Sequence, residues 1–161
     1  MSSFFKVEIL GEYDTENREN EQKFTATYVV HPRFKNDNGR SLVYDFAILR
    51  LNRDVDFTDE ISPACLPAEG LSSRQAVVVG WGNEKAVNRY SGLPGLVKGS
   101  GYKLATILQE LDVNFISDTK CRQSYSQLGI ELAESNMCAV SEVGDTCTGD
   151  SGGGIFVNNN G

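Results

Sequence analysis

The chain has 161 residues, 40% of them hydrophobic, so it is long enough to form one domain with a sizeable core. Its 22 acidic and 15 basic residues give a formal net charge of -7, and no cluster of Lys and Arg is present that would track a phosphate backbone. No apolar run approaches the roughly 20 residues of a membrane-spanning helix, and the first six residues lack the features of a secretory signal. We therefore expect neither nucleic acid nor a membrane as a partner.

Short apolar runs rich in β-forming residues, separated by polar or glycine-containing stretches, predict an antiparallel all-β protein. In the segment 45–51 alternate residues fall on opposite faces, and both faces are mostly apolar, which is typical of a barrel wall packed on two sides. Ser117 or Asp118 can cap one short helix that runs through Cys121 towards Gly129. The predicted strands span 4–10, 23–30, 45–51, 75–81, 107–115, 136–140 and 154–157.

Two further stretches are predicted to be irregular. Residues 82–101 contain five glycines and one proline without periodicity, which predicts an exposed loop between strands. Residues 158–161 carry a turn signal after the last predicted strand. The chain contains no internal repeat.

Four cysteines occur, at spacings that fit neither a zinc finger nor a thioredoxin motif. Four cysteines allow three pairings, and the spacing alone leaves all three open. The positions are Cys65, Cys121, Cys138 and Cys147.

The stretch Asp145-Thr-Cys-Thr-Gly-Asp-Ser-Gly-Gly-Gly154 contains the most informative chemistry. A serine flanked by glycines has backbone N–H groups that a substrate carbonyl can approach closely, because no Cβ obstructs them. Two such N–H groups directed at one point form an oxyanion hole, and losing one donor costs about 3 to 4 kcal/mol of transition-state stabilisation. A shorter Gly-x-Ser-x-Gly pattern alone would equally fit a flexible loop.

The longer string resembles the nucleophile motif of the trypsin and chymotrypsin family of serine proteases. Asp45-Phe-Ala-Ile-Leu-Arg-Leu51 resembles the strand that carries the triad aspartate. Further landmarks follow the family's order: Ile61-Ser-Pro-Ala-Cys-Leu-Pro67, Val79-Gly-Trp-Gly82, Leu108-Gln-Glu-Leu-Asp-Val113 and Asn136-Met-Cys-Ala139. The resemblance implies two antiparallel six-stranded β-barrels, both incomplete here, with residues 1–70 in the first, 71–161 in the second and a short helix near 118–128.

The resemblance also implies a role for each matching residue. Ser151 becomes the nucleophile, Asp45 orients the histidine, and the N–H groups of Gly149 and Ser151 form the oxyanion hole. Asp145 at the floor of the specificity pocket selects Arg or Lys, so the expected function is serine-type endopeptidase activity on protein or peptide substrates, with protease inhibitors as further partners. A solvated aspartate at a strand start is the alternative for Asp45, and a turn aspartate is the alternative for Asp145.

The only histidine is His31, and it does not match the catalytic base. It precedes Asp45 by 14 positions, against about 45 in the template triad, and it stands in a His-Pro dipeptide that many family members carry in addition to the base. The family's catalytic histidine lies in a motif like Ala-Ala-His-Cys, upstream of the segment where this chain begins. We therefore expect a fragment that lacks both ends of the catalytic domain and is inactive by itself. The alternative function is a non-catalytic homologue that acts as a binding or regulatory module.

Further expectations rest on the same resemblance. Asp150 lacks the freed amino terminus with which the family aspartate pairs, so its side chain is expected to turn to solvent and leave the oxyanion hole poorly formed. Cys121 pairs with Cys138, whereas Cys65 and Cys147 are left without partners. An extracellular location is implied, and no cofactor is required.

An acidic loop suggests one optional metal. Five carboxylates crowd the connection between two predicted strands, and hard oxygen ligands at alternating spacing suit calcium. The loop resembles in position and length the calcium-binding loop of some trypsins, and a solvated acidic turn is the alternative. The expected ligands are Glu12 and Asp14, and the other carboxylates belong to Glu16, Glu19 and Glu21.

Overall fold

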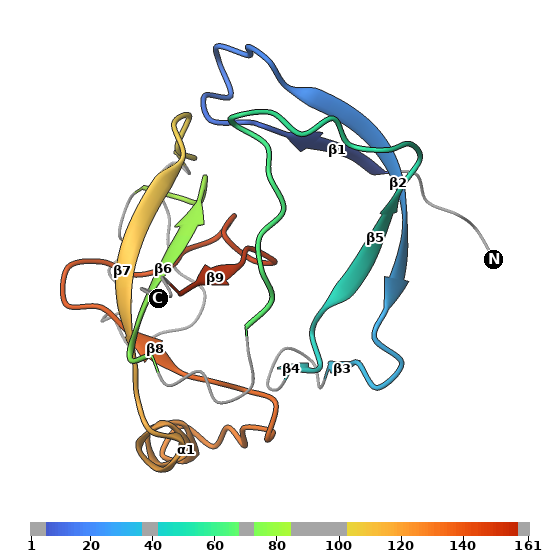
Figure 1. The fold of residues 1–161 in the computed structure, drawn as a ribbon. Helices are drawn as coiled ribbons and strands as arrows, with labels where there is room; N and C mark the ends of the chain where they lie inside the picture. Colours follow the sequence, from blue (N-terminus) through green and yellow to red (C-terminus); the bar gives the residue numbers. More distant parts are fainter. Residues whose placement is uncertain (1–5, 37–41, 68–72, 85–102, 158–161) are drawn as a thin grey trace. The chain divides into compact units, whose positions relative to one another are not determined.

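The structure is a computed structural model that describes residues 6–36, 42–67, 73–84 and 103–157. Its regular elements are short strands and one helix, which confirms the predicted all-β class (Figure 1). The predicted loop at 82–101 and the turn at 158–161 fall mostly or wholly outside the described residues, as does the start of the first predicted strand. The elements are β1 Lys6–Leu10, β2 Gln22–Val30, β3 Lys35–Asn36, β4 Leu42–Val43, β5 Ala47–Leu51, β6 Gln75–Gly80, β7 Gln109–Phe115, α1 Asp118–Ser126, β8 Ala139–Val140 and β9 Ile155–Phe156.

The chain divides into two compact units, and each contains one main sheet. The first unit falls within Met1–Ser72 and Ile116–Cys138, and the second within Ser73–Phe115 and Ala139–Gly161. The first unit therefore includes α1, a segment that the sequence assigned to the second barrel. The barrel boundary between residues 70 and 71 remains a prediction.

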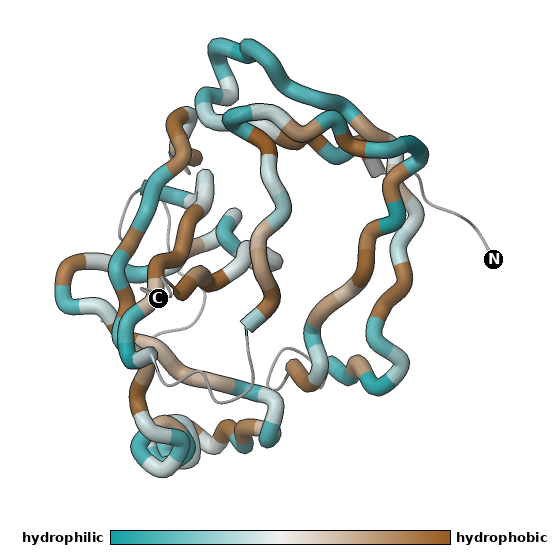
Figure 2. The backbone as a smooth tube through the Cα atoms, in the orientation of Figure 1, coloured by the Kyte–Doolittle hydropathy of each residue, from teal (hydrophilic) through white to brown (hydrophobic). Residues whose placement is uncertain are grey.

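The main sheet of the first unit has the antiparallel order β1-β2-β5 (Figure 1). The central strand, β2, pairs Ala26 with Lys6 on one side and with Leu51 on the other. Phe24 and Ala26 lie two residues apart on one face and are each 2% exposed, so the period of two in this strand selects the core face. The long connection between β1 and β2 is strongly hydrophilic (Figure 2).

Strand β5 begins later and packs less than the sequence predicted. Tyr44 has φ 52° and its carbonyl accepts the N–H of Phe46 at 2.9 Å, so a turn delays the strand until Ala47. Ile48 is 68% exposed, because no element within the described part of the chain covers that face. The expectation of a wall packed on both faces is thus wrong for β5 in this structure.

Strands β3 and β4 form a small antiparallel pair that the sequence did not predict. Lys35 lies opposite Val43 and Asn36 opposite Leu42. Each strand has only two residues, and two residues are too few to produce an alternating apolar pattern.

The second unit is built on a four-stranded antiparallel sheet with the order β8-β7-β6-β9. Ala76 of β6 lies directly opposite Val113 of β7, and both side chains are buried. The valine run of β6 makes it one of the most hydrophobic strands (Figure 2). This paired register fixes the exit of β6 at Gly80, from which the chain leads to the candidate site.

Helix α1 forms where the sequence placed it. The Ser117 side chain accepts the backbone N–H of Lys120, which satisfies one of the free donors in the first turn. Cys121, on the buried face of the helix, is bridged to Cys138, the pairing that the resemblance implied. Neither main sheet closes into a barrel within the described residues, as expected for incomplete barrels. No helix among them is long and apolar enough to cross a membrane.

Candidate active site

The predicted nucleophile lies in a tight turn of the second unit, which we call the nucleophile loop, residues 145–154. Ser151 stands between Gly149, with φ 106°, and Gly152, with φ 88°, conformations that residues with a Cβ rarely adopt. The N–H of Asp150 donates to the carbonyl of Cys147 at 3.1 Å, and the N–H of Gly153 donates to the carbonyl of Asp150 at 3.0 Å. Ser151 is exposed at the tip of this turn.

The two predicted oxyanion-hole donors are not engaged elsewhere in the part of the chain that the structure describes. The backbone N–H groups of Gly149 and Ser151 have no hydrogen-bond acceptor there, and both residues are exposed. Two free N–H groups beside an exposed hydroxyl can receive an oxygen that carries negative charge. Both N–H groups are therefore available to an acceptor from outside the described residues.

Asp150 differs from its expected position. Its Oδ1 accepts the backbone N–H of Gly82 at 2.8 Å, and its Oδ2 accepts the backbone N–H of Cys147 at 2.8 Å. The carboxylate therefore points into the protein, and the expectation that it turns to solvent is wrong in this structure. The physical reason is that two backbone donors can stabilise a carboxylate without a cationic partner.

The other predicted residues of the loop are accessible. Asp145 is exposed and has no hydrogen-bond or ion-pair partner within the residues described. Cys147 is a free, half-buried thiol, and Cys65, in the first unit, is a free, exposed thiol. Both cysteines are thus without partners here, as the resemblance implied.

Asp45 belongs to the first unit, so it and Ser151 are each described within their own unit. Asp45 follows the turn at Tyr44 and precedes β5, and its side chain is exposed. It makes no hydrogen bond or ion pair with any residue that the structure describes. Its carboxylate is free to accept a hydrogen bond from a histidine supplied to it.

His31 does not have the geometry of a triad base. Its ring stacks on Tyr44 with centroids 4.7 Å apart and lies against Phe46 at 4.6 Å. Its Nδ1 accepts the backbone N–H of Arg33 at 3.2 Å, which leaves the ring proton of the neutral form on Nε2. In a triad Nδ1 instead donates its proton to the aspartate, so His31 acts here as part of an aromatic cluster.

The acidic loop brings together Glu12 and Glu21, rather than Glu12 and Asp14 alone. The side chain of Glu12 is only 10% exposed, and its pKa is raised by burial and by contact with Glu21, with Arg18 opposing the shift. The Oε1 atoms of Glu12 and Glu21 are buried and have no hydrogen-bond partner among the residues that the structure describes, whereas Asp14 Oδ1 accepts the N–H of Glu16 at 3.0 Å.

The sequence analysis did not choose Glu21. The signal that could have found it is the antiparallel register of β1 and β2. Leu10 pairs with Gln22, so Glu12 and Glu21 lie just beyond this pair, at the two ends of the connection between the strands. No group of three His, Cys, Asp or Glu side chains suited to a metal occurs among the described residues.

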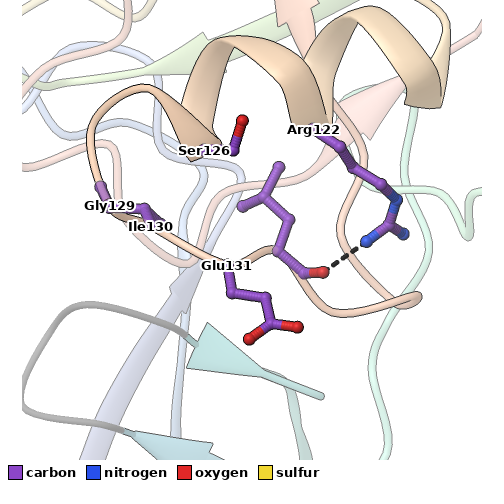
Figure 3. A pocket seen from close by; sticks show the side chains of 6 residues that line it. Arg122, Ser126, Gly129, Ile130 and Glu131 are labelled. Carbon is purple, nitrogen blue, oxygen red and sulfur yellow. Dashed lines mark hydrogen bonds between the residues drawn. The ribbon is translucent and has the colours of Figure 1, made fainter.

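A shallow hollow in the first unit lies beside the C-terminal end of α1, and none of the predicted site residues lines it (Figure 3). Arg122 donates to the carbonyl of Leu132 across it, and to the carbonyl of Ala133 at 3.2 Å. The guanidinium therefore braces the loop that follows the helix. Its lining is completed by Ser126, Gly129, Ile130 and Glu131.

Comparison with known proteins places this chain in a family. Residues 2–161 match the Trypsin family, so the chain belongs to the trypsin family of serine proteases, which are hydrolases that act on proteins. The chain is 37% identical over 119 residues to the Spaetzle-processing enzyme of Drosophila melanogaster, covering 70% of this chain and 26% of that protein. It is 30% identical over 158 residues to Trypsin-1 of Astacus astacus, covering 95% of this chain and 59% of that protein.

A solved structure supports the fold independently. Mouse neuropsin, described as a serine protease expressed in the limbic system of the brain, aligns with a TM-score of 0.70 at 24% identity. The alignment covers 92% of this chain and 60% of that one. The chain therefore spans less than two thirds of the length of each of these relatives.

Proposed function

We propose that the protein of which these residues form part is a serine-type endopeptidase that cleaves after Arg or Lys. The observation that carries the proposal is the nucleophile loop, in which an exposed Ser151 lies beside the unengaged N–H groups of Gly149 and Ser151. Membership of the trypsin family supports the same chemistry.

In the proposed reaction the Ser151 Oγ attacks the acyl carbon of the scissile peptide, and its proton passes to a histidine base. The carbonyl oxygen becomes an oxyanion bound by the N–H groups of Gly149 and Ser151. The C–N bond breaks as the same histidine protonates the leaving amine, and water then hydrolyses the acyl-enzyme to regenerate Ser151. Asp45 accepts a hydrogen bond from the histidine and stabilises its charged form.

His31 does not serve as that base, because its Nδ1 accepts a backbone N–H and its ring lies between aromatic side chains. Catalysis therefore needs a histidine that these 161 residues do not contain, and the 161-residue chain alone is inactive. The proposed Arg/Lys selectivity rests on Asp145, whose carboxylate would pair with the substrate cation.

The test of this function is the cleavage of peptide amides by the natural gene product. An arginine amide should be cleaved at least tenfold faster than the matching phenylalanine amide, and D145S should remove most of this preference. Cleavage of both amides at equal rates would contradict the role of Asp145.

The second candidate is a homologue that binds proteins without cleaving them, and the observation that favours it is that the one histidine of these 161 residues is engaged by Arg33 and Tyr44. The two candidates differ in one measurable way. A non-catalytic homologue retains binding to a protein partner when Ser151 is replaced by Ala and shows no cleavage of arginine amides in either form.

We also propose a structural calcium ion on the β1–β2 connection, held by Glu12 and Glu21 with Asp14 nearby. Two buried carboxylate oxygens without partners suit a hard cation, which would remove their repulsion.

An extracellular location is proposed as well, because the disulfide between Cys121 and Cys138 persists in oxidising compartments. Protein inhibitors that present Arg or Lys are the proposed further partners.

A further inference from the structure

The exit of β6 and the nucleophile loop are in unusually close contact within the second unit. Gly80 ends β6, and Gly82 follows it after one residue. A Cβ built on Gly80 would lie 2.1 Å from Asp150 Oδ1, and one built on Gly82 would lie 2.3 Å from Asp150 Oδ2. Both distances are far below any real carbon–oxygen contact, so this space exists only because neither residue has a side chain.

Polar contacts use the same space. The Gly82 and Cys147 N–H groups each donate to one oxygen of the Asp150 carboxylate, at 2.8 Å. Hydrogen bonds to an ionised acceptor are shorter and stronger than neutral ones, so this pair holds the carboxylate firmly. Asp150 thereby links β6 to the turn that carries Ser151, 68 residues away from Gly82 along the chain.

Backbone contacts extend this link on both sides of Gly82. The N–H of Asn83 donates to the carbonyl of Thr148 at 3.0 Å, and the N–H of Ala105 donates to the carbonyl of Gly82 at 3.2 Å. A Cβ on Gly149 would lie 3.0 Å from the Cα of Gly82, so the two backbones touch directly at the oxyanion donor. The position of Gly149 therefore depends on the position of Gly82.

From these contacts we infer that Gly80 and Gly82 are positioning residues for catalysis: they form a side-chain-free seat for the Asp150 carboxylate, which orders Gly149 and Ser151. This inference rests on the proposed function of those two residues. It differs from the ion pair that the resemblance implied for Asp150, because the seat uses only backbone donors of the second unit. A carboxylate can accept about four hydrogen bonds, and the seat uses two of them. A cationic partner could therefore also bind Asp150 without displacing the two backbone donors.

Amide hydrogen exchange of the 161-residue chain tests the seat without any need for catalysis. The reference is wild type, and the variants are D150N, D150A and G82A. D150A should lower the exchange protection of the Gly82 and Cys147 amides by about ten- to a hundredfold, the range expected for one hydrogen bond to a charged acceptor. D150N keeps the size of the side chain but loses one acceptor, so it should lower the protection of at least one of the two amides.

The matched control is G144A, also in the second unit, because a Cβ there would meet only the flexible end of Leu111, with Cδ1 at 2.9 Å. The amide resonances of Gly149 and Ser151 should shift in G82A and in a further variant, G80A, but not in G144A. D150N is not used for this readout, because residues 149 and 151 adjoin position 150 in sequence.

Unchanged protection of both amides in D150A would overturn the seat. If the Gly82 and Cys147 amides lose exchange protection but the amide resonances of Gly149 and Ser151 do not shift, the positioning role is overturned. If G82A fails to fold, the D150A and D150N protection data decide the seat, and G80A, whose Cβ would meet the same carboxylate, decides the positioning role. Because none of these readouts involves cleavage, a failure here is distinct from a failure of the endopeptidase proposal.

Discussion

Glu12 and Glu21 approach each other at the two ends of the connection between β1 and β2, and the Oε1 atom of each is buried without a hydrogen-bond partner. Two acidic groups so placed favour a protonated state, and the pKa of Glu12 is raised by burial first and by contact with Glu21 second.

This relationship predicts that stability depends on pH. The folded-state pKa of Glu12 lies above the ordinary value of 4.5, so the folded state binds the proton more tightly than the unfolded state. The contribution to stability is therefore fully present below about pH 4.5 and is lost as the pH rises through the raised pKa. Urea unfolding of wild type and E12Q from pH 4 to 8 should show a smaller loss of stability with rising pH in E12Q. E16Q, an exposed change in the same loop, is the control, and equal slopes in E12Q and wild type would contradict the account.

Calcium bound at the proposed site should restore the stability that is lost when the two carboxylates ionise. Millimolar calcium should raise the midpoint of thermal unfolding of wild type at pH 7, because the cation binds the folded state and neutralises the two carboxylates. The shift should be lost in E12Q and in E21Q. Magnesium is the control cation, since it prefers a smaller octahedral site with retained waters. A calcium shift that persists in both variants would place the ion elsewhere.

The core of the first unit should depend strongly on Phe24. Its side chain is 2% exposed, and F24A leaves a cavity that costs about 3 to 5 kcal/mol of unfolding free energy. V29A on the same strand is the matched control, because Val29 is 66% exposed and its truncation should change stability by less than about 0.5 kcal/mol. Urea unfolding followed by circular dichroism measures both, and similar losses in the two variants would contradict the assigned core face.

The disulfide should contribute through the unfolded state. Cys121 and Cys138 close a loop with a sequence separation of 17, for which the chain-entropy estimate is about 3 kcal/mol. The double variant C121S/C138S should lose about this amount of unfolding free energy. C65S, which removes an exposed free thiol, should have little effect. A loss in the double variant no larger than that in C65S would show that the bridge does not stabilise the fold.

The sequence predicted the strands that bury alternating or continuous apolar residues, because their period is read directly from the chain. Strand β2 and helix α1, with its Ser117 cap, both lie within a residue or two of their predicted bounds. The pair β3 and β4 could not be predicted, since two-residue strands carry no period. The start of β5 was placed too early, because the turn at Tyr44 depends on a positive φ in a residue that rarely adopts it.

The site was predicted less completely, for a different reason. The motif identified Ser151 and Gly149, whose backbone requirements are local. It could not reveal how Asp150 is stabilised, since one of its two donors is the backbone N–H of Gly82, 68 residues away in the chain. Any residue except proline has such a donor, so no side-chain pattern marks it. The absence of side chains at Gly80 and Gly82 is the only trace of this contact in the sequence.

Covalent labelling of Ser151 tests the central claim most directly. A biotinylated fluorophosphonate, followed by peptide mapping, should modify the natural gene product at Ser151 and leave its S151A variant unmodified. The isolated 161-residue chain should not be labelled, because the Nδ1 atom of its one histidine, His31, already accepts the backbone N–H of Arg33 and cannot donate to a triad aspartate. Failure to label the natural product at Ser151 would contradict the proposed nucleophile. Rapid labelling of the isolated chain would contradict the role assigned to the missing base.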